Sequence, residues 1–349
     1  MGRAGVQPMS KTKAAIKAVA SYLPVAELTN EQLAEEFGDV EANVIWERTG
    51  IKVRRVASPD ECASDLGVAA ARHLFESGAS SPEEIDFLLL CTQSPDYFLP
   101  TTACLMQTRL GLRTDCGAID FNQGCSGYVY GLSLAKGMIE TGAARNVLLV
   151  TADTYTRFIN RRDRSVRTLF GDGAAATLIS AQAAEEDLIG PFVFGTDGRG
   201  AEQLIVQAGG CRRPLNNEAM IESVDEQGNW RSSQNLYMNG PEIFNFTLRT
   251  VPRAMDELME KSGLSLEEID YVIPHQANKF MLERLQRRMK VAAEKFHIDL
   301  EQTGNTVSST IPIALEGARR QGRLSAGQRV ALVGFGVGYS WAATIVRIV

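Results

Sequence analysis

Apolar runs and amphipathic stretches alternate along the chain, and the two patterns predict different elements. Strands are predicted at residues 14–24, 84–90, 145–150, 268–274 and 328–333. Helices are predicted after Thr29 and over residues 64–78, 127–139 and 279–290. Because several of the strands are almost wholly apolar, both of their faces are expected to be buried. Strands that alternate with helices indicate an α/β fold with largely parallel sheets covered by helices.

Two pairs of these predicted strands repeat at one shared spacing. Residues 84–90 match residues 268–274 at an offset of 184, and Arg145 pairs with Arg329 at the same offset. One long unit copied once predicts two halves of the same architecture and excludes a solenoid of many short units. The predicted halves are residues 14–184 and 185–349, preceded by a disordered extension over residues 1–13.

The stretch from residue 190 to residue 239 is the least regular part of the chain. It is rich in Gly, Asn, Gln and charged residues, so it is predicted to be linker and surface loop. A loop of this length either lines a substrate entrance or serves as a connector, and both interpretations are open.

Composition narrows the class of protein. The chain has 349 residues, 44% of them hydrophobic, and a formal net charge of −6, which argues against nucleic acid as the main partner. Its six cysteines form no C-x-x-C pair and its three histidines offer no zinc-ligand spacing, so no metal site is predicted. No apolar run approaches the roughly 18 to 20 residues that span a bilayer, and no signal sequence is evident. A soluble cytoplasmic protein with reduced thiols is expected.

Cys125 is the strongest candidate for a reacting residue. It lies between a predicted buried strand at residues 116–121 and the predicted helix at residues 127–139. The unpaired N–H groups and the positive dipole end of a helix N-terminus favour a thiolate, which is the nucleophilic form. The alternative is that Cys125 is a buried structural thiol, as most lone cysteines are. Adding the offset of 184 to 125 gives Ser309, so the two turns are expected to face each other across the junction.

Two other polar residues lie where they could act with a cysteine. His275 follows the strand predicted around Ile273 and precedes a helix, and Asn305 stands in a turn between Gly304 and Thr306. N–H groups of a histidine and an asparagine that point at one oxygen would stabilise an enolate, while the cysteine carries an acyl group. This set suits carbon–carbon bond formation at a thioester. His73, which has no such partners, is expected to be a packed or surface residue.

Five motifs follow one another along the chain: Asn122–Gly127, Leu169–Ala175, His275–Asn278, Gly304–Thr306 and Phe335–Trp341. Together they resemble the 3-oxoacyl-ACP synthase III group of the thiolase superfamily, over residues 14–349. The resemblance implies a thiolase-like five-layered αβαβα fold made of two duplicated halves, a homodimer, and no metal or redox cofactor.

The resemblance also implies a reaction, a decarboxylative Claisen condensation of an acyl-CoA with malonyl-ACP. Cys125 would take the acyl group, and His275 and Asn305 would bind the malonyl thioester carbonyl while carbon dioxide leaves. The backbone N–H groups of Cys125 and Val337 would form the oxyanion hole. A glycine is more usual at the position of Val337.

Substrate-binding residues follow from the same resemblance. Arg48 matches an arginine at the nucleotide end of CoA, and Asn278 matches a residue of the pantetheine channel. Gly240 is also expected to bind substrate. The stacking tryptophan of the family stands four residues before the arginine, where this chain has Val44. Trp46 either substitutes for that tryptophan or is ordinary packing.

Two further features bear on partners and substrate. The predicted helix at residues 279–290 carries basic residues that suit an acidic carrier protein, although such charges also occur on any solvated helix face. These are Lys279, Arg284, Arg287, Arg288 and Lys290. Leu99 replaces a phenylalanine that many members contribute to the acyl pocket of the partner subunit, and the smaller side chain would admit a branched, longer or aromatic acyl group.

Four other functions are alternatives to this condensation. A thiolase needs a second cysteine near the C-terminus, but the last cysteine is Cys211. A hydroxymethylglutaryl-CoA synthase needs a glutamate base ahead of the nucleophile, where Gln93 stands. A specialised starter-unit condensing enzyme or acyltransferase of polyketide or quinolone type keeps the same machinery and remains the main alternative. A catalytically silent partner subunit is disfavoured by the intact Cys-His-Asn set.

Overall fold

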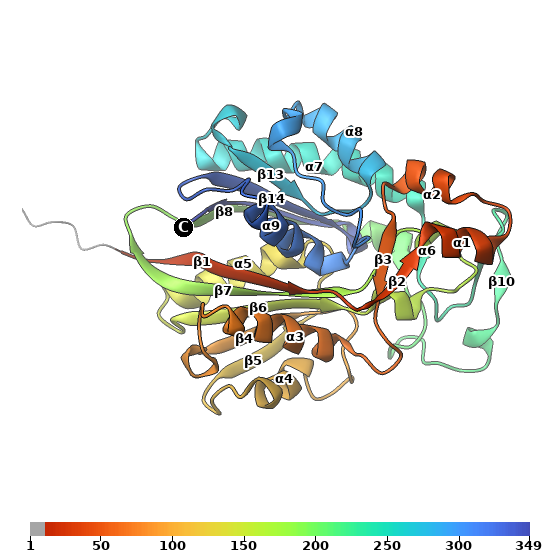
Figure 1. Ribbon diagram of the computed structural model, residues 1–349, viewed down its shortest axis with the longest axis horizontal. Helices are drawn as coiled ribbons and strands as arrows, with labels where there is room; N and C mark the ends of the chain where they lie inside the picture. Colours follow the sequence, from red (N-terminus) through yellow and green to blue (C-terminus); the bar gives the residue numbers. More distant parts are fainter. Residues whose placement is uncertain (1–10) are drawn as a thin grey trace, which may run out of the picture.

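The computed structural model describes residues 11–349, which form five layers of alternating helices and sheets (Figure 1). Two helices, α3 (Ala63–Glu76) and α4 (Thr102–Leu110), cover the outer face of the first sheet. Between the two sheets lie α5 (Gly127–Glu140) and α9 (Thr310–Arg320). The outer face of the second sheet is covered by α7 (Gly240–Ser262), with α8 (Lys279–Met289) packed beside it. The predicted α/β class and αβαβα layering are confirmed.

The first sheet has five strands in the order β1-β7-β6-β4-β5. Their bounds are Lys11–Tyr22, Gly173–Ala184, Asn146–Asp153, Phe87–Cys91 and Gly117–Phe121, in that order. Strand β4 runs parallel to β5 and to β6, whereas β7 is antiparallel to both of its neighbours. The prediction of largely parallel sheets is therefore wrong for this edge, where β6 returns into β7 without a crossover helix that packs on the sheet.

The second sheet has four strands in the order β13-β14-β15-β8. Their bounds are Tyr271–Pro274, Arg329–Gly336, Ser340–Arg347 and Ile189–Thr196, in that order. Strands β13 and β14 are parallel and the other two pairs are antiparallel, so the pattern β4-β6-β7-β1 of the first sheet recurs. In place of a partner like β5, β13 has, within residues 11–349, only an isolated bridge from Val272 to Phe296. The predicted duplication is confirmed, while the domain boundary at residues 184 and 185 stays a prediction.

Local signals in the sequence explain several element ends. Thr29 accepts the N–H of Gln32, whose side chain accepts the N–H of Thr29, so the predicted helix cap is a complete capping box. This cap opens α1 (Asn30–Phe37), which ends at Gly38 in the left-handed conformation. The remaining short elements are α2 (Ala42–Thr49), α6 (Arg164–Arg167), β2 (Ala26–Thr29), β3 (Val53–Val56), β9 (Leu204–Ile205), β10 (Ser223–Val224), β11 (Trp230–Arg231) and β12 (Tyr237–Met238).

Three predictions about local structure were wrong. Residues 11–13 do not belong to a disordered extension, because they pair with the end of β7; the rest of that predicted extension, residues 1–10, lies outside the described residues. The stretch at residues 190–239 is not only linker, because β8 forms an edge of the second sheet. Strand β5 is not buried, because it is the last strand of its sheet, and Ile119 is 40% exposed.

Candidate active site

Cys125 lies in the turn between β5 and α5, and its side chain is 4% exposed. The end of β14 approaches it closely, since a Cβ added to Gly336 would lie 2.8 Å from the sulfur. Only glycine permits that approach. The backbone N–H groups of Cys125 and Val337 both act on the sulfur, where they lower the pKa of the thiol. The two backbone groups predicted to form an oxyanion hole are thus gathered at the reacting atom.

The backbone N–H groups at the turn lower the pKa of the thiol in the predicted direction, but burial outweighs them. Burial raises the pKa of the Cys125 thiol to about 12, and the negative charge of Asp153 adds to the rise. The two backbone N–H groups do not offset this desolvation. The position of Cys125 at a helix start could not predict this outcome, because it does not show how deeply the sulfur is buried.

His275 and Asn305 meet in the interior, where they are 2% and 5% exposed. Asn305 Nδ2 lies 3.5 Å from Nε2 of His275, and Asn305 Oδ1 accepts the N–H of Val307 at 2.9 Å. On its other side, His275 Nδ1 lies 2.7 Å from the hydroxyl oxygen of Thr310. Burial lowers the pKa of His275 to about 3, so its imidazole is neutral at ordinary pH.

A strained backbone holds the asparagine. Val307 has a φ of 54°, which is unfavourable for a β-branched residue, and it is fully buried. This conformation allows its N–H to turn back onto Asn305 Oδ1, so the amide nitrogen of Asn305 faces His275. Backbone strain of this kind is found where surrounding contacts fix a functional geometry.

The three predicted catalytic residues line one cavity of about 180 Å³. Cys125, His275 and Asn305 share it with Asn278 and Gly240, both of which were predicted to bind substrate. The remaining walls are mostly apolar and come from both halves of the chain. The remaining lining residues are Leu169, Phe170, Leu204, Met238, Ile243, Phe244, Ala277, Met281, Phe335 and Gly336.

A second, larger cavity of about 880 Å³, which was not predicted from the sequence, adjoins the turn of Cys125. Leu204 lines both cavities. Two residues that line the larger cavity are paired: Tyr155 donates its hydroxyl to Gln93 Oε1 at 3.1 Å, and a Cβ on Gly124 would lie 2.7 Å from that oxygen. Both residues follow strands of the first sheet, and the positions after strand ends were the signal that could have found them.

The buried carboxyl group of Asp153 forms hydrogen bonds with both halves of the chain beside the site. Asp153, at the end of β6, accepts the backbone N–H of Gln93 at 2.8 Å and the hydroxyl of Ser308. Burial raises its pKa to about 7. Ser309, the predicted counterpart of Cys125, directly precedes α9 and donates its hydroxyl to the carbonyl of Thr151 at 3.0 Å. A Cβ added to Gly127 would lie 3.7 Å from Cβ of Ser308, so the two predicted helix-start turns approach each other at the junction.

The two residues predicted to bind the nucleotide end of CoA, Trp46 and Arg48, do not line the same pocket. Trp46 is half-buried, with Lys52 Nζ 4.9 Å and Lys279 Nζ 5.6 Å from its ring centre. It lines a pocket of about 460 Å³ that shares no residue with the cavity of Cys125. Arg48 is exposed and lines neither. The structure therefore brings Trp46, and not Arg48, into a pocket.

The predicted docking residues are all exposed on α8, as are Phe280 and Lys290 nearby. Arg284 lies 5.2 Å from the ring centre of Phe280, and Arg287 pairs with Glu283 at 3.3 Å. Leu99 is 83% exposed, beside Phe98 at 84%. These side chains are available to a partner.

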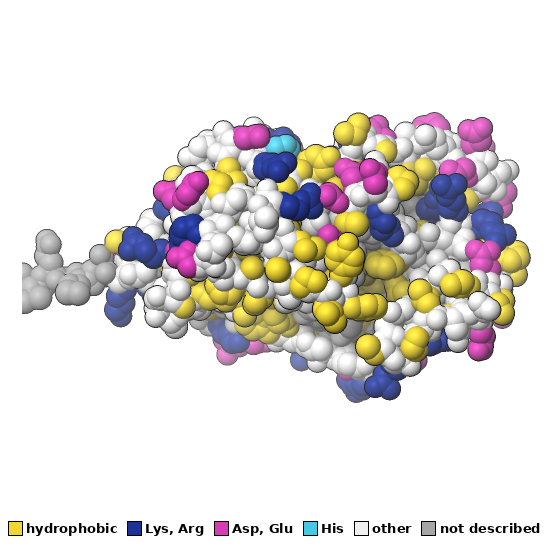
Figure 2. All heavy atoms as spheres, turned by 90° about the horizontal axis from the view of Figure 1, so that it is seen from below, with side chains coloured by type: hydrophobic (Ala, Val, Ile, Leu, Met, Phe, Trp, Pro, Cys, Tyr) yellow, Lys and Arg dark blue, Asp and Glu magenta, His cyan; other side chains and the backbone are white. Residues whose placement is uncertain are grey.

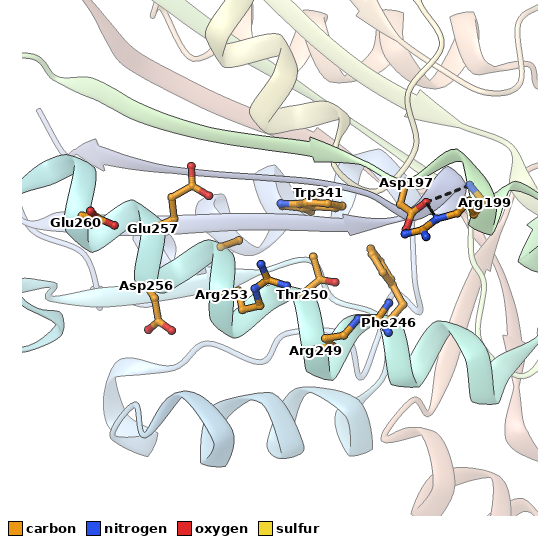
Figure 3. Close-up of a pocket in the computed structure, with 11 residues that line it drawn as sticks. Asp197, Arg199, Phe246, Arg249, Thr250, Arg253, Asp256, Glu257, Glu260 and Trp341 are labelled. Atoms are coloured by element: carbon orange, nitrogen blue, oxygen red, sulfur yellow. Dashed lines mark hydrogen bonds and ion pairs between the residues drawn. The ribbon is translucent and has the colours of Figure 1, made fainter.

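Another cleft, of about 650 Å³, lies between α7 and Trp341 of β15 (Figure 3). Arg249 and Arg253, one turn apart on α7, line it together with Asp197. It shares no residue with the cavity of Cys125, and its lining contains neither a thiol nor an imidazole. It is therefore separate from the candidate active site.

Within residues 11–349, no group of three or more His, Cys, Asp or Glu side chains could hold a metal ion. Over the same range, no helix has both the length and the apolar character that a membrane crossing requires. All six cysteines, which lie in this range, are free thiols.

Two duplicated α/β halves with a cysteine, a histidine and an asparagine in one cavity at their junction define a condensing enzyme of the thiolase-like class. Family models agree: residues 119–198 match 3-oxoacyl-[acyl-carrier-protein (ACP)] synthase III, and residues 259–348 match the C-terminal part of the same enzyme. The chain belongs to the 3-oxoacyl-ACP synthase III family.

Individual relatives span the whole chain. A beta-ketoacyl-[acyl-carrier-protein] synthase III of Caldanaerobacter subterraneus subsp. tengcongensis is 37% identical over 97% of this chain and 98% of its own. A crystal structure of a 3-oxoacyl-(acyl-carrier-protein) synthase III is 54% identical, with a TM-score of 0.95 over 96% of this chain and 100% of that chain. The priming beta-ketosynthase of the R1128 polyketide biosynthetic pathway is 30% identical, with a TM-score of 0.83 over 99% of each chain.

Proposed function

We propose that the protein is a beta-ketoacyl-ACP synthase III-like acyltransferase, which condenses an acyl-CoA with malonyl-ACP at the start of fatty acid synthesis. The observation that carries the proposal is the shared cavity of Cys125, His275 and Asn305. The names of the relatives, which are beta-ketoacyl-ACP synthases III, support the same reaction.

In the first step, the Cys125 sulfur attacks the acyl-CoA carbonyl. The bond between the acyl carbon and the CoA sulfur breaks, and the thiol proton ends on the departing CoA sulfur. The N–H groups of Cys125 and Val337 would stabilise the oxyanion of the tetrahedral intermediate. Because burial raises the pKa of the thiol to about 12, the proton must leave as the substrate binds or as attack proceeds.

In the second step, malonyl-ACP loses carbon dioxide, and the resulting enolate attacks the acyl-cysteine. The enolate oxygen would accept N–H bonds from His275 and Asn305, whose nitrogens lie 3.5 Å apart. The bond between the acyl carbon and the Cys125 sulfur breaks, which frees the 3-oxoacyl-ACP product, and the Cys125 thiolate then takes a proton from solvent. A neutral His275 suits this role, since an imidazolium would protonate the carbanion before it could attack.

Mass spectrometry after incubation with a panel of acyl-CoAs tests the proposal. We expect one acyl mass on the peptide that contains Cys125. His275→Ala and Asn305→Ala are expected to acylate normally but to release no carbon dioxide from malonyl-ACP. The proposal fails if no acyl-CoA in the panel gives an adduct, or if both variants still decarboxylate.

A specialised starter-unit condensing enzyme or acyltransferase is the second candidate. It is supported by the 880 Å³ cavity with its Gln93–Tyr155 pair, by the exposed Leu99 and by the similarity to a polyketide priming enzyme. The same acyl-CoA panel separates the two candidates. A preference for acetyl-CoA or a short branched acyl-CoA favours fatty acid initiation, and a preference for a larger starter favours the second.

We also propose that the protein is a cytoplasmic homodimer joined along the β5 edge. Hydrophobic side chains gather in a band on one face of the surface (Figure 2). Near β5, the exposed apolar residues include Phe98, Leu99 and Ile119, next to a strand edge with no partner in the described chain. An open apolar strand edge favours association. Sedimentation of the wild type and of Ile119→Lys tests this: a wild-type monomer would refute it.

For the carrier protein, we propose docking on the basic face of α8. Lys279 and Arg284 are exposed near the first turns of this helix, and Asn278 at its N-terminus lines the cavity. Reversing the charges of Arg284 and Arg288 is expected to raise KM for malonyl-ACP while acylation by acyl-CoA stays unchanged. An unchanged KM would indicate that these charges are only a solvated helix face.

A further inference from the structure

Thr310 is a buried residue at the start of α9 for which no role was assigned from the sequence. It is 3% exposed, and its hydroxyl oxygen lies between two groups that could accept its proton. His275 Nδ1 is 2.7 Å away, and the carbonyl oxygen of Val307 is 3.1 Å away. Because a hydroxyl has one proton, it can donate to only one of the two at full strength.

Either the hydroxyl or the ring N–H could donate in the contact to Nδ1, and the length of the second contact favours the hydroxyl, because the reverse arrangement would require the hydroxyl to donate to Val307 over the longer distance. A distance of 2.7 Å is typical of a strong hydrogen bond from a hydroxyl, whereas 3.1 Å lies beyond the usual range for an O–H donor. If Thr310 donates to Nδ1, this nitrogen carries the lone pair, and the proton of the imidazole is on Nε2.

The contact to Asn305 agrees with this assignment. The nitrogens Asn305 Nδ2 and His275 Nε2 are 3.5 Å apart, which is long for a hydrogen bond between them. It is a natural separation for two N–H donors that point at a common third atom in the cavity. The amide orientation is set independently, because Asn305 Oδ1 accepts the N–H of Val307.

We propose that Thr310 is a positioning residue that holds His275 in the tautomer with its proton on Nε2, so that this N–H can bind the enolate oxygen. The proposal rests on the proposed condensing function. Thr310 itself does not touch the substrate cavity lined by Cys125, and it acts only through the imidazole.

The tautomer matters because only one ring nitrogen bears a proton. With burial keeping the pKa of His275 near 3, the imidazole stays neutral and cannot donate from both nitrogens. In the other tautomer, the Nε2 lone pair would face the developing anion. Loss of one such donor costs on the order of 10² to 10³-fold in rate.

The kinetic test compares Thr310→Val with Thr310→Ser. Valine keeps the shape and removes the hydroxyl, so decarboxylation of malonyl-ACP by the acylated enzyme should fall about 10²-fold, while acylation of Cys125 and KM for acyl-CoA stay near wild type. Serine restores the donor and should restore most of the rate. Thr247→Val is a matched control, since Thr247 is also fully buried and donates its hydroxyl only to Ile243 of its own helix, at 2.8 Å.

A spectroscopic test does not depend on the Thr310 variants folding. The chain has three histidines, so ¹⁵N-histidine labelling gives few signals, and His275→Ala assigns the one of interest. We expect wild-type His275 to carry its proton on Nε2. A proton on Nδ1 would overturn the proposal, as would undiminished decarboxylation by a folded Thr310→Val. If the wild type acylates but releases no carbon dioxide, the proposed function fails instead, whatever the tautomer.

Discussion

The helix-start turns of Cys125 and Ser309 occupy equivalent positions in the two halves but have different roles. In the first half, Cys125 lines the substrate cavity with its sulfur against Gly336. In the second half, Ser309 turns away from the cavity and bonds Thr151 of the first sheet through both its carbonyl, at 3.0 Å, and its hydroxyl, at 2.9 Å. The first turn carries the proposed nucleophile, and the second connects the two halves through hydrogen bonds. Duplication thus provides two similar frames, and the neighbours of each decide its use.

Removing the thiol should give the largest effect. Cys125→Ala is expected to lower condensation by on the order of 10⁴-fold or more, because the covalent step is lost. The measurement is product formation from acyl-CoA and malonyl-ACP. Cys104→Ala is the control, since Cys104 is an exposed thiol outside both cavities. Equal loss in the two variants would contradict the assignment.

The reactivity of the Cys125 thiol should depend steeply on pH. Since its pKa is raised to about 12, the thiol is protonated below that value and the thiolate fraction grows tenfold with each pH unit. Alkylation of the Cys125 peptide by iodoacetamide, followed by mass mapping, should therefore rise about 10²-fold from pH 7 to pH 9. A plateau in this range would mean that the turn does stabilise a thiolate.

Filling the space beside the Cys125 sulfur should have an intermediate effect on the rate of acylation. In Gly336→Ala the new methyl group would lie 2.8 Å from the sulfur, so the end of β14 must move and carry Val337 away. Acylation is expected to slow about 10 to 10²-fold, since one oxyanion donor is displaced. Gly137→Ala on α5 meets no atom within 4 Å and serves as control. An unaffected acylation rate in Gly336→Ala would remove Val337 from the oxyanion hole.

A substitution in the second turn should lower the stability of the protein and leave acylation of Cys125 unchanged. Ser309→Ala removes the hydroxyl that bonds Thr151, leaving buried acceptors without that donor. The free energy of unfolding is expected to fall by about 1–3 kcal/mol, measured by urea denaturation. Acylation of Cys125 should persist at temperatures where the variant is folded. Loss of acylation with unchanged stability would reverse the contrast between the turns.

Much of the site could be predicted because the signals are local. Cys125, His275 and Asn305 each stand at a strand end or helix start, where a short run of neighbours marks the turn. Asn278 and Gly240 also proved to line the cavity. Arg48 could not be placed in this way, because the direction of a side chain on a surface helix depends on what packs beside that helix.

Other features depended on contacts that no local pattern encodes. The pairing of Tyr155 with Gln93 joins residues 62 positions apart, and the contact of Thr310 with His275 joins residues 35 apart. The exposed edge of β5 follows from its place as the last strand of the sheet, although its apolar sequence resembles that of the buried strands.

The sequence by itself determined the succession of strands and helices, the duplication at an offset of 184, the cap at Thr29 and the identity of the candidate reacting side chains. These depend on side-chain chemistry and on residues within a few positions of one another. The tertiary structure alone decided how deeply Cys125 and His275 are buried, and therefore that one is a protonated thiol and the other a neutral imidazole. The pKa of a group is set by its exposure to solvent and by the charges around it. In a folded chain, this environment is formed by segments that are remote in sequence, such as residues 125 and 336, and that only packing brings together.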